Sequence, residues 1–465
     1  MSSDFDTGGP AAAGTAAGRV ADRGATVCVI GAGLSGLPAV KNLVEHGFEV
    51  DCYERETGVG GAWNWRHDRS PMSAHTHLIS SRPTTQYPDF PMPDSWPDYP
   101  HHSRMLAYLE RYADHFELRQ HIWFGTEVVR VRPAPGDRWE VTTRGTGGAG
   151  GPEEERTSRY AAVVVANGHN WSPVLPEYEG LGDFAGQVLP ASALSDGAQL
   201  RGRRVLVVGG GNTGCDVAVE VAQQAAACWH STRRGYWYLP KYLLGRPTDQ
   251  VNDAILALRL PLRLRQWLSQ LLLRLTVGDL RRFGLRRPDH RVLETHPIVN
   301  GQLVHHLGHG AITPVPDVAR FHRYGVELAD GRTVEPDVVV LATGYQPRFE
   351  FLDPTLLDAD GTGRPRLHLH AFGRQHPTLA IVGLLQPAAG MGVLVHWQAV
   401  TVARWLRLRE SQPARAAEVW AGIAREGARG WAPAGVQPTA RHWFEVGHVP
   451  YLRSLQRTLA ALAAA

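Results

Sequence analysis

The chain has 465 residues, of which 43% are hydrophobic and 20% are charged, as in an ordinary folded protein. At about 150 residues per domain, this length predicts two or three domains. The 48 basic and 45 acidic residues give a net charge of +3 and are scattered along the chain. A nucleic-acid-binding surface would gather them into a basic stripe, so we expect no nucleic-acid partner.

Residues 1–24 are mostly Ala, Gly, Asp and Ser, which predicts a disordered tail without the apolar core of a secretion signal. The chain contains no run of about 18 uncharged apolar residues, so we expect no membrane-spanning helix. None of the four cysteines belongs to a C-x-x-C pair, so we expect neither a disulfide framework nor a zinc site; they are Cys28, Cys52, Cys215 and Cys228. These observations favour a cytoplasmic protein.

The fold is expected to begin near Ala25 with a βαβ unit. An apolar run over Ala25–Ile30 and a second run over Glu49–Tyr53 flank helical spacing over Leu37–His46. The turn before the helix reads Gly31-Ala32-Gly33-Leu34-Ser35-Gly36, whose backbone amides can cradle a pyrophosphate. Glu54 ends the second strand, where it can accept hydrogen bonds from a ribose. A dinucleotide site is therefore predicted here.

Further glycines follow in Gly58–Trp63, where they let the chain approach a flat cofactor and Trp63 supplies an aromatic wall. Ordinary core packing of Trp63 is the alternative. Short β-prone segments then predict a small antiparallel meander with a loose glycine-rich loop over Gly145–Gly151. The three segments are Thr126–Val131, Trp139–Thr143 and Tyr160–Ala166.

A second βαβ unit is predicted from Arg204–Val208, Thr213–Gln224 and Ala226–Ser231. It carries a second glycine fingerprint, Gly209-Gly210-Gly211-Asn212-Thr213-Gly214. Its second strand ends in arginines instead of an acidic residue, and Arg233 and Arg234 can grip a 2′-phosphate. We therefore predict NADPH at this unit, with solvated surface arginines as the alternative.

The remaining elements return the chain to the first unit. Leu256–Arg282 predicts an amphipathic helical pair that packs on the core or between domains, in preference to a membrane surface. Strands are predicted at Val338–Ala342 and Thr378–Leu384, followed by a helix over Val395–Arg409.

Two dinucleotides imply hydride transfer from a nicotinamide to a flavin. Without a closely spaced cysteine pair, oxygen or a small molecule is left as the electron acceptor, which favours a monooxygenase or an oxidase. The histidines lack acidic or thiolate partners at ligand spacing, so no metal is expected; those considered were His305, His306, His309, His368 and His370.

Beyond residue 25 nearly the whole chain resembles the flavin-containing monooxygenases, a family of class B flavoprotein monooxygenases. Besides the two fingerprints and the Gly-Gly-x-Trp element, the resemblance lies in Tyr87–Pro93, Tyr108–Phe116, Ala166–Pro176, Gly211–Asp216, Leu341–Tyr345 and Gly383–Pro387. It implies an α/β fold with two three-layer Rossmann-like domains, the NADPH domain being inserted into a discontinuous FAD domain. The expected boundaries are 25–196 for the first FAD part, 197–334 for the NADPH domain with a helical insertion at about 240–300, and 335–465 for the second FAD part.

The resemblance also implies a reaction. NADPH reduces FAD, oxygen gives a C4a-hydroperoxyflavin, and one oxygen atom passes to nitrogen or sulfur of a small organic substrate, for example by N-hydroxylation of an amine in specialised metabolism. The expected FAD contacts are Gly31, Ala32, Gly33, Leu34, Ser35, Gly36, Glu54, Gly61, Ala62, Trp63 and Val128. The expected NADP contacts are Gly209, Gly211, Asn212, Thr213, Gly214, Cys215, Asp216, Arg233 and Arg234. No side chain is assigned acid–base catalysis, because the flavin carries the chemistry.

The sequence departs from the family pattern at two places. The interdomain motif Phe-x-Gly-x-x-x-His-x-x-x-Tyr keeps Phe184 and Gly186 but has Pro190 and Leu194 at its last two positions. The asparagine that supports the flavin adduct aligns with Ile79, which leaves Ser80 or Ser81 as candidate substitutes.

Two alternative functions stay open at this point. One is a Baeyer–Villiger monooxygenase acting on a ketone, indicated by Gly-Gly-Ala-Trp-Asn-Trp65. The other is an uncoupled NADPH oxidase-like flavoprotein, indicated by Pro190 and Ile79. The sequence does not settle whether the chain forms a homo-oligomer.

Overall fold

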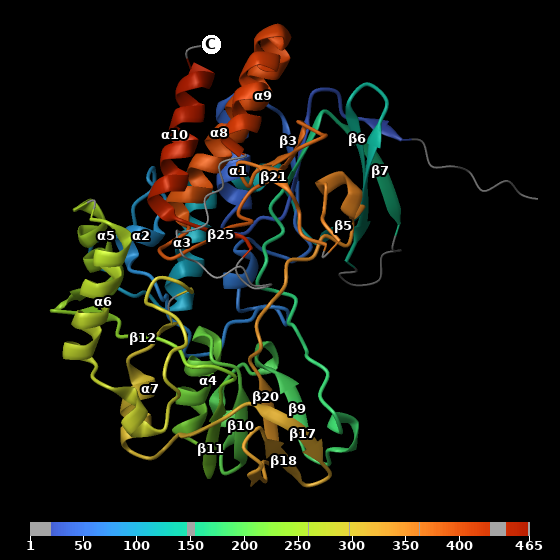
Figure 1. Cartoon of the computed structure of the whole chain (residues 1–465). Coiled ribbons are helices and arrows are strands. Elements are labelled where there is room, and N and C mark those ends of the chain that lie inside the picture. Colours follow the sequence, from blue (N-terminus) through green and yellow to red (C-terminus); the bar gives the residue numbers. More distant parts are fainter. Residues whose placement is uncertain are drawn as a thin grey trace, which may run out of the picture.

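The computed structural model describes residues 20–146, 154–258, 260–296, 298–361, 363–427 and 443–463. It contains two α/β units, with long C-terminal helices on the first unit and a mostly helical insertion on the second (Figure 1).

The first unit is built on a seven-stranded sheet. Its strands, in spatial order, are β21 (Leu367–His368), β22 (Phe372–Gly373), β23 (Leu379–Ile381), β8 (Ala162–Val165), β2 (Val27–Ile30), β3 (Val50–Tyr53) and β4 (Ile122–Trp123). The five strands from β23 to β4 run parallel, and Val27 lies opposite both Val50 and Ala162. Strands buried on both faces need continuous apolar runs, which β2 and β8 provide.

Alternate side chains of β2 face two different layers. Val27 and Val29 pack with helices α1 (Gly36–Glu45), α3 (His102–His115), α8 (Gly392–Ser411) and α10 (His448–Ala463). Cys28 and Ile30 pack with a four-stranded sheet of order β1 (Ala21–Asp22), β7 (Glu155–Tyr160), β6 (Arg138–Gly145) and β5 (Thr126–Ala134). The unit therefore has three layers. Helix α9 (Pro413–Gly427) lies beside α8 and α10.

The last segment predicted for the meander is wrong. Tyr160–Ala166 is not its third strand: β7 takes that place, and β8 is a central strand of the parallel sheet. The reason is burial, because the run Ala162–Val165 is buried throughout whereas β7 exposes its polar residues. Most of the predicted loop Gly145–Gly151 lies outside the described residues.

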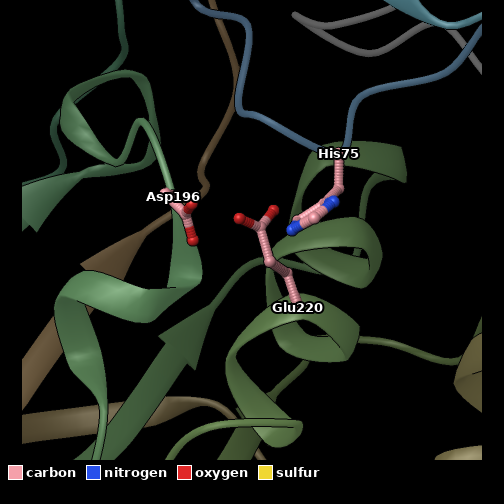
Figure 2. Close-up of side chains that lie close together, drawn as sticks. All are labelled: His75, Asp196 and Glu220. Atoms are coloured by element: carbon pink, nitrogen blue, oxygen red, sulfur yellow. The ribbon is translucent and has the colours of Figure 1, made fainter.

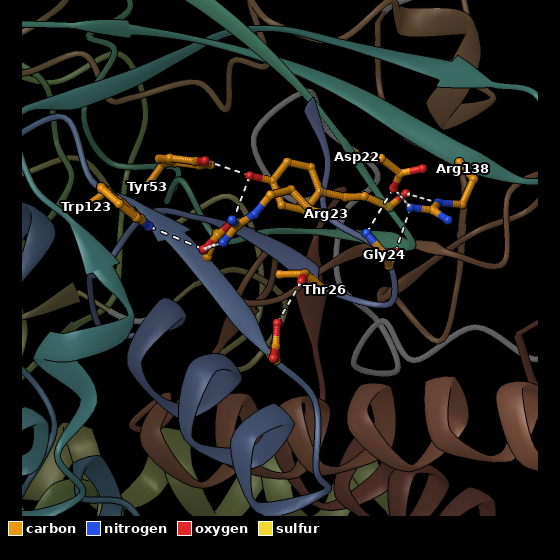
Figure 3. A network of polar contacts seen from close by, with 10 residues as sticks. Asp22, Arg23, Gly24, Thr26, Tyr53, Trp123 and Arg138 are labelled. Carbon is orange, nitrogen blue, oxygen red and sulfur yellow. Dashed lines mark hydrogen bonds and ion pairs between the residues drawn. The ribbon is translucent and has the colours of Figure 1, made fainter. Parts of the chain in front are cut away.

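The ordered chain also begins earlier than Ala25. Strand β1 pairs with β7, and Arg23 donates from Nε and Nη2 to the two carboxylate oxygens of buried Asp51, both at 2.8 Å. Figure 3 shows Arg23, Tyr53 and Trp123 gathered at this network. Residues 20–24 thus belong to the fold, and residues 1–19 of the predicted tail lie outside the described residues.

The second unit has a five-stranded, all-parallel sheet. Its order is β16 (Thr313–Val315), β11 (Ala227–Ser231), β10 (Arg204–Val208), β20 (Val338–Leu341) and β9 (Gln187–Pro190). One face carries α4 (Asn212–Ala222) and α7 (Gln302–Gly308), and the other carries β17 (Val318–His322), β18 (Gly325–Leu328) and β19 (Thr333–Val334). Three layers form again.

The predicted boundaries 197 and 334 are too narrow for this sheet. Strand β9 precedes the first boundary and β20 follows the second, yet β20 lies between β9 and β10. Strand β20 pairs with both neighbours, and its side chains are buried in the cores on the two faces of this sheet, so it belongs here and not to the first unit. Where the chain crosses between the units, Val174 donates its amide to the carbonyl of Gly344 at 2.9 Å.

The insertion follows β11. It contains β12 (Tyr238–Leu239) paired with β15 (Ile298–Val299), a hairpin of β13 (Tyr242–Leu243) and β14 (Arg246–Pro247), and helices α5 (Thr248–Ala257) and α6 (Leu262–Thr276). A helical pair was predicted, but its first helix begins eight residues earlier than Leu256. In the described parts of the chain, no helix is both long and apolar enough to cross a membrane.

Candidate cofactor sites

A cavity of about 380 Å³ opens at the carboxyl ends of β2, β3 and β8. Nine of the residues predicted for FAD line it: Gly31, Gly33, Leu34, Ser35, Glu54, Gly61, Ala62, Trp63 and Val128. Ala32 and Gly36 are part of the same turn but do not line the cavity. Ligands bind at this edge of a parallel sheet, where the strands' carboxyl ends meet a helix N-terminus.

The glycines of the first fingerprint are required by close backbone contacts. Gly31 has φ +101°, and a Cβ there would lie 2.7 Å from the carbonyl oxygen of Ala166. A Cβ at Gly36 would lie 1.8 Å from the oxygen of Gly31. The turn therefore packs against the sheet. The amides of Gly31 and Ala32 already donate to Tyr53 and Glu54, so the amides nearer the start of α1 are the ones that can meet a pyrophosphate.

Glu54 is fixed at the cavity by two amides. Its Oε2 accepts from Ala32 at 2.7 Å and its Oε1 accepts from Glu56 at 3.0 Å. Burial raises the pKa of this carboxyl, while the two amides act in the opposite direction. Each oxygen keeps a lone pair for a further donor, which suits a ribose diol.

The second glycine element forms the adjacent wall. Gly60 donates to the carbonyl of Ala32 at 3.0 Å, and a Cβ at Gly61 would lie 3.1 Å from the Cα of Gly33. The short helix Gly61–Trp63 places Trp63 at the cavity and also against the apolar core. Trp63 therefore belongs to the cavity wall and to the core packing at once.

Sequence reasoning missed much of the lining, including Arg55, Glu56, His67, Arg69, Asn167, Gly168, His169, Trp171, Gly383 and Met391. One signal was present, because Asn167 and Gly168 follow β8 as Gly31 follows β2. His67, whose Nε2 lies 3.1 Å from the oxygen of Gly61, has no such local signal.

Ser80 and Ser81 do not line this cavity. The hydroxyl of Ser80 lies 2.8 Å from that of Thr85, and the amide of Ser81 donates to Asp249 in the insertion. Pro190 ends the edge strand β9, and Leu194 is buried in the core of the second unit.

The second fingerprint repeats the geometry of the first. Gly209 has φ +133°, and a Cβ there would lie 2.2 Å from the oxygen of Ala342. A Cβ at Gly214 would lie 1.9 Å from the oxygen of Gly209. Ala342 directly follows β20, as Ala166 directly follows β8, and each packs against the first glycine of a fingerprint. Both turns therefore allow a phosphate group to approach the backbone closely.

Helix α4 places the other predicted NADP residues. Asn212 accepts from the amide of Val299, and Asp216 accepts from Nδ2 of Asn300 at 2.7 Å. Burial raises the pKa of Asp216 to about 6, against the opposing effects of Lys241 and Asn300. The side chain of Cys215 is buried in the core, so only its backbone can meet a ligand.

The two arginines after β11 differ in their surroundings. Nη2 of Arg234 lies 3.2 Å from the carboxylate of Asp289 and 3.0 Å from Nδ1 of His290, and its side chain is 21% exposed. Arg233 is exposed, and among the described residues it forms no ion pair. Its carbonyl accepts from Arg286 at 3.0 Å. Arg233 is therefore the freer cation for a 2′-phosphate.

One group of possible metal ligands lies where the units meet (Figure 2). His75, Asp196 and Glu220 place one ligand atom each within 4.8 Å of one another. The Glu220 carboxylate, however, already accepts from the amide of Gly197 at 2.6 Å and from the hydroxyl of Ser73 at 3.0 Å. These bonds give it a role in joining the units, and we assign no metal.

The four cysteines are buried, and none of them forms a disulfide bond. Burial raises the pKa of the Cys28 and Cys52 thiols well above their usual range, and that of Cys228 to about 12. Such thiols stay protonated and unreactive near neutral pH. They offer no dithiol relay for electrons.

A family model described as "Flavin-binding monooxygenase-like" matches residues 24–429. The chain belongs to this family. It is 33% identical to dimethylaniline monooxygenase [N-oxide-forming] 2 of Mus musculus over 82% of the chain and 72% of the relative, and 31% identical to flavin-containing monooxygenase 5 of Cavia porcellus over 84% and 76%. S-allyl-L-cysteine S-oxygenase of Allium sativum has a similar fold, with a TM-score of 0.66, 20% identity and coverage of 94% of this chain and 88% of that chain.

Membership confirms the resemblance and the α/β fold class predicted from the sequence. The chain is a flavin-dependent monooxygenase, with FAD and NADPH as its cofactors. The first glycine turn, Glu54 and the cavity fit FAD. The second glycine fingerprint and Arg233 fit NADPH.

Proposed function

We propose that this monooxygenase transfers one oxygen atom from O2 to a nitrogen or sulfur atom of a small organic substrate. The observation that carries the proposal is the matched pair of glycine turns, one at the flavin cavity and one at a unit whose strand ends in Arg233. The names of the Mus musculus and Allium sativum proteins, an N-oxide-forming and an S-oxygenating enzyme, support heteroatom oxygenation.

Each group of residues has a separate task in this proposal. The amides at the start of α1, after Gly33, receive the FAD pyrophosphate. Glu54 accepts from its ribose, and Arg233 pairs with the 2′-phosphate of NADPH. When bound, the flavin accepts hydride from NADPH and activates oxygen. The cavity walls from Gly60–Trp63 and Met391 exclude water, which would otherwise divert the reduced oxygen to hydrogen peroxide.

N-hydroxylation of an amine in specialised metabolism is one form that nitrogen oxygenation could take. A cytoplasmic location fits four thiols that form no disulfide bond.

The test is incubation of the FAD-loaded protein with NADPH and ¹⁸O₂ in the presence of N,N-dimethylaniline, thioanisole or cyclohexanone. We expect one ¹⁸O atom in the N-oxide or sulfoxide, detected by mass spectrometry, and one product formed per NADPH consumed. An ester from the ketone with no heteroatom product would establish the Baeyer–Villiger alternative. Peroxide equal to NADPH with every substrate would establish the oxidase alternative.

A further inference from the structure

The insertion of the second unit is joined to the first unit by a compact set of polar contacts. They run from residues 241–250 to residues 78–99. Lys241 donates from Nζ to the carbonyl of Leu78 at 3.2 Å, and its own carbonyl accepts from the hydroxyl of Tyr99. The hydroxyl of Tyr242 donates to Asp98 at 3.1 Å.

Asp249 makes the strongest of these contacts. Its Oδ2 accepts from the amide of Ser81 and from the hydroxyl of Thr84, both at 2.7 Å. Its Oδ1 accepts from the amide of Gln250 at 3.0 Å. Ser81 is fully buried, so its amide depends on this carboxylate. Hydrogen bonds to a charged acceptor are about twice as strong as neutral ones.

The segment that Asp249 holds lies against the wall of the flavin cavity. It forms α2 (Arg82–Thr85), whose backbone contacts that of residues 390–392. A Cβ at Gly390 would lie 2.2 Å from the oxygen of Thr84, and one at Gly392 would lie 2.1 Å from the oxygen of Thr85. Met391, between these glycines, lines the cavity. A continuous set of contacts therefore runs from the insertion to the cavity wall.

We propose that Asp249 is a positioning residue that couples the NADPH unit to the flavin cavity. It holds α2 and residues 390–392 in the position that lets hydride pass between the two cofactors. This inference rests on the proposed function, because it assumes that NADPH reduces the bound FAD. Asp249 does not line the cavity, and its contacts to the first unit are those with Ser81 and Thr84, through which it acts.

The first experiment is anaerobic reduction of the FAD-loaded protein in a stopped-flow instrument. Asp249→Asn keeps the shape of the side chain but removes its charge and faces the Ser81 amide with a weaker acceptor. We expect the reduction rate at saturating NADPH to fall about tenfold. The Kd for NADPH should stay within about twofold of wild type, and reduction by dithionite, which needs no second unit, should be unchanged.

Asp253→Asn is the matched control, since Asp253 is an exposed carboxylate one turn further along α5. Thr84→Val is a second variant that removes one donor from the other side of the contact and should slow reduction by NADPH to a smaller extent. Wild-type reduction rates in both Asp249→Asn and Thr84→Val would overturn the proposal. Equal slowing with dithionite would also overturn it, because the defect would then lie in the flavin site itself.

Hydrogen exchange followed by mass spectrometry gives a readout that does not depend on activity. In Asp249→Asn, peptides covering residues 78–86 and 388–395 should exchange faster than in wild type, and in Asp253→Asn they should not. Unchanged exchange in the first peptide would overturn the contact. If NADPH fails to reduce even the wild-type protein, both the proposed function and the proposed coupling are wrong. Hydrogen exchange still tests the contact of Asp249 with residues 81–84 in that case.

Discussion

Arg233 and Arg234 are adjacent in the sequence but differ in what they can do. Arg234 is engaged with Asp289 and His290, and Arg233 is exposed. We predict that Arg233→Ala raises the KM for NADPH about 10- to 100-fold, as expected for loss of a charge-assisted contact to phosphate, and that Arg234→Ala has a smaller effect. Steady-state kinetics with NADPH and NADH measure this.

The double variant Arg233→Ala with Arg234→Ala should leave the KM for NADH nearly unchanged, because NADH lacks the 2′-phosphate. Equal losses with both coenzymes would refute the assignment of these arginines.

Glu54 supports a second prediction at this scale. In Glu54→Gln one of the two amides, from Ala32 or Glu56, would face an NH₂ group instead of an acceptor. FAD affinity should fall about tenfold or more, measured by fluorescence titration of the apoprotein. Glu49→Gln is the control and should bind FAD as wild type does, because Glu49 is an exposed carboxylate just before the start of β3, at the opposite end of that strand from Glu54.

Single residues were predictable where a local rule fixes their place. The spacing from Gly31 to Glu54 is set by one βαβ unit, and the structure places both at the cavity. His67 and Arg69 also line it, but they come from a loop whose path is set by packing and not by a sequence pattern. Ser80 and Ser81 follow the position at which the resemblance expects asparagine, but neither residue lines the cavity.

The first prediction about a whole element concerns β1. A chain that begins at Ala25 lacks β1 and Arg23. Among the residues that the structure describes, the buried carboxylate of Asp51 then keeps the Tyr160 and Trp123 donors. Because Arg23 is 42% exposed, water weakens its ion pair, so we expect a loss of about 1–2 kcal/mol in the free energy of unfolding. Urea denaturation measures it. A chain that begins at Val20 is the control, and equal stability of the two would contradict the role of β1.

The raised pKa of Asp216 predicts a pH dependence for α4. The folded protein holds this proton more tightly than the unfolded chain, whose value is near 3.8. The resulting stability is present below pH 3.8 and is lost as the pH rises through about 6. Asp216→Asn should remove this dependence and stabilise the NADPH-free protein at pH 8 by up to about 3 kcal/mol. Urea denaturation of wild type and Asp216→Asn at pH 5 and pH 8 tests this prediction. The same fall in the free energy of unfolding between the two pH values in both proteins would contradict it.

Elements were predicted well where periodicity was strong and poorly where two strands follow each other directly. The βαβ units appear within one or two residues of their predicted bounds. The boundary between β7 and β8 was missed because only a turn at Ala161 separates a half-exposed strand from a buried one. Periodicity does not reveal which sheet a short apolar run joins.

For the whole molecule, the two-unit plan followed from the two fingerprints, but the boundaries did not. Strands β9 and β20 enter the second sheet from outside the predicted interval, because β20 must fill the place between β10 and β9. No sequence pattern marks that pairing. The contact between the insertion and residues 78–99 was equally unpredictable, since the hydrogen bonds of Asp249 join residues 168 and 165 positions apart.

Because all four thiols are buried, the folded chain should not react with thiol reagents. A single cysteine introduced on the surface of each unit would then be the only site that a maleimide dye could label. One such cysteine at Glu410 on α8 and another at Arg332 beside β19 would report the separation of the two units by energy transfer as coenzyme binds. The native sequence already supplies the silent background that such measurements usually have to be engineered to obtain.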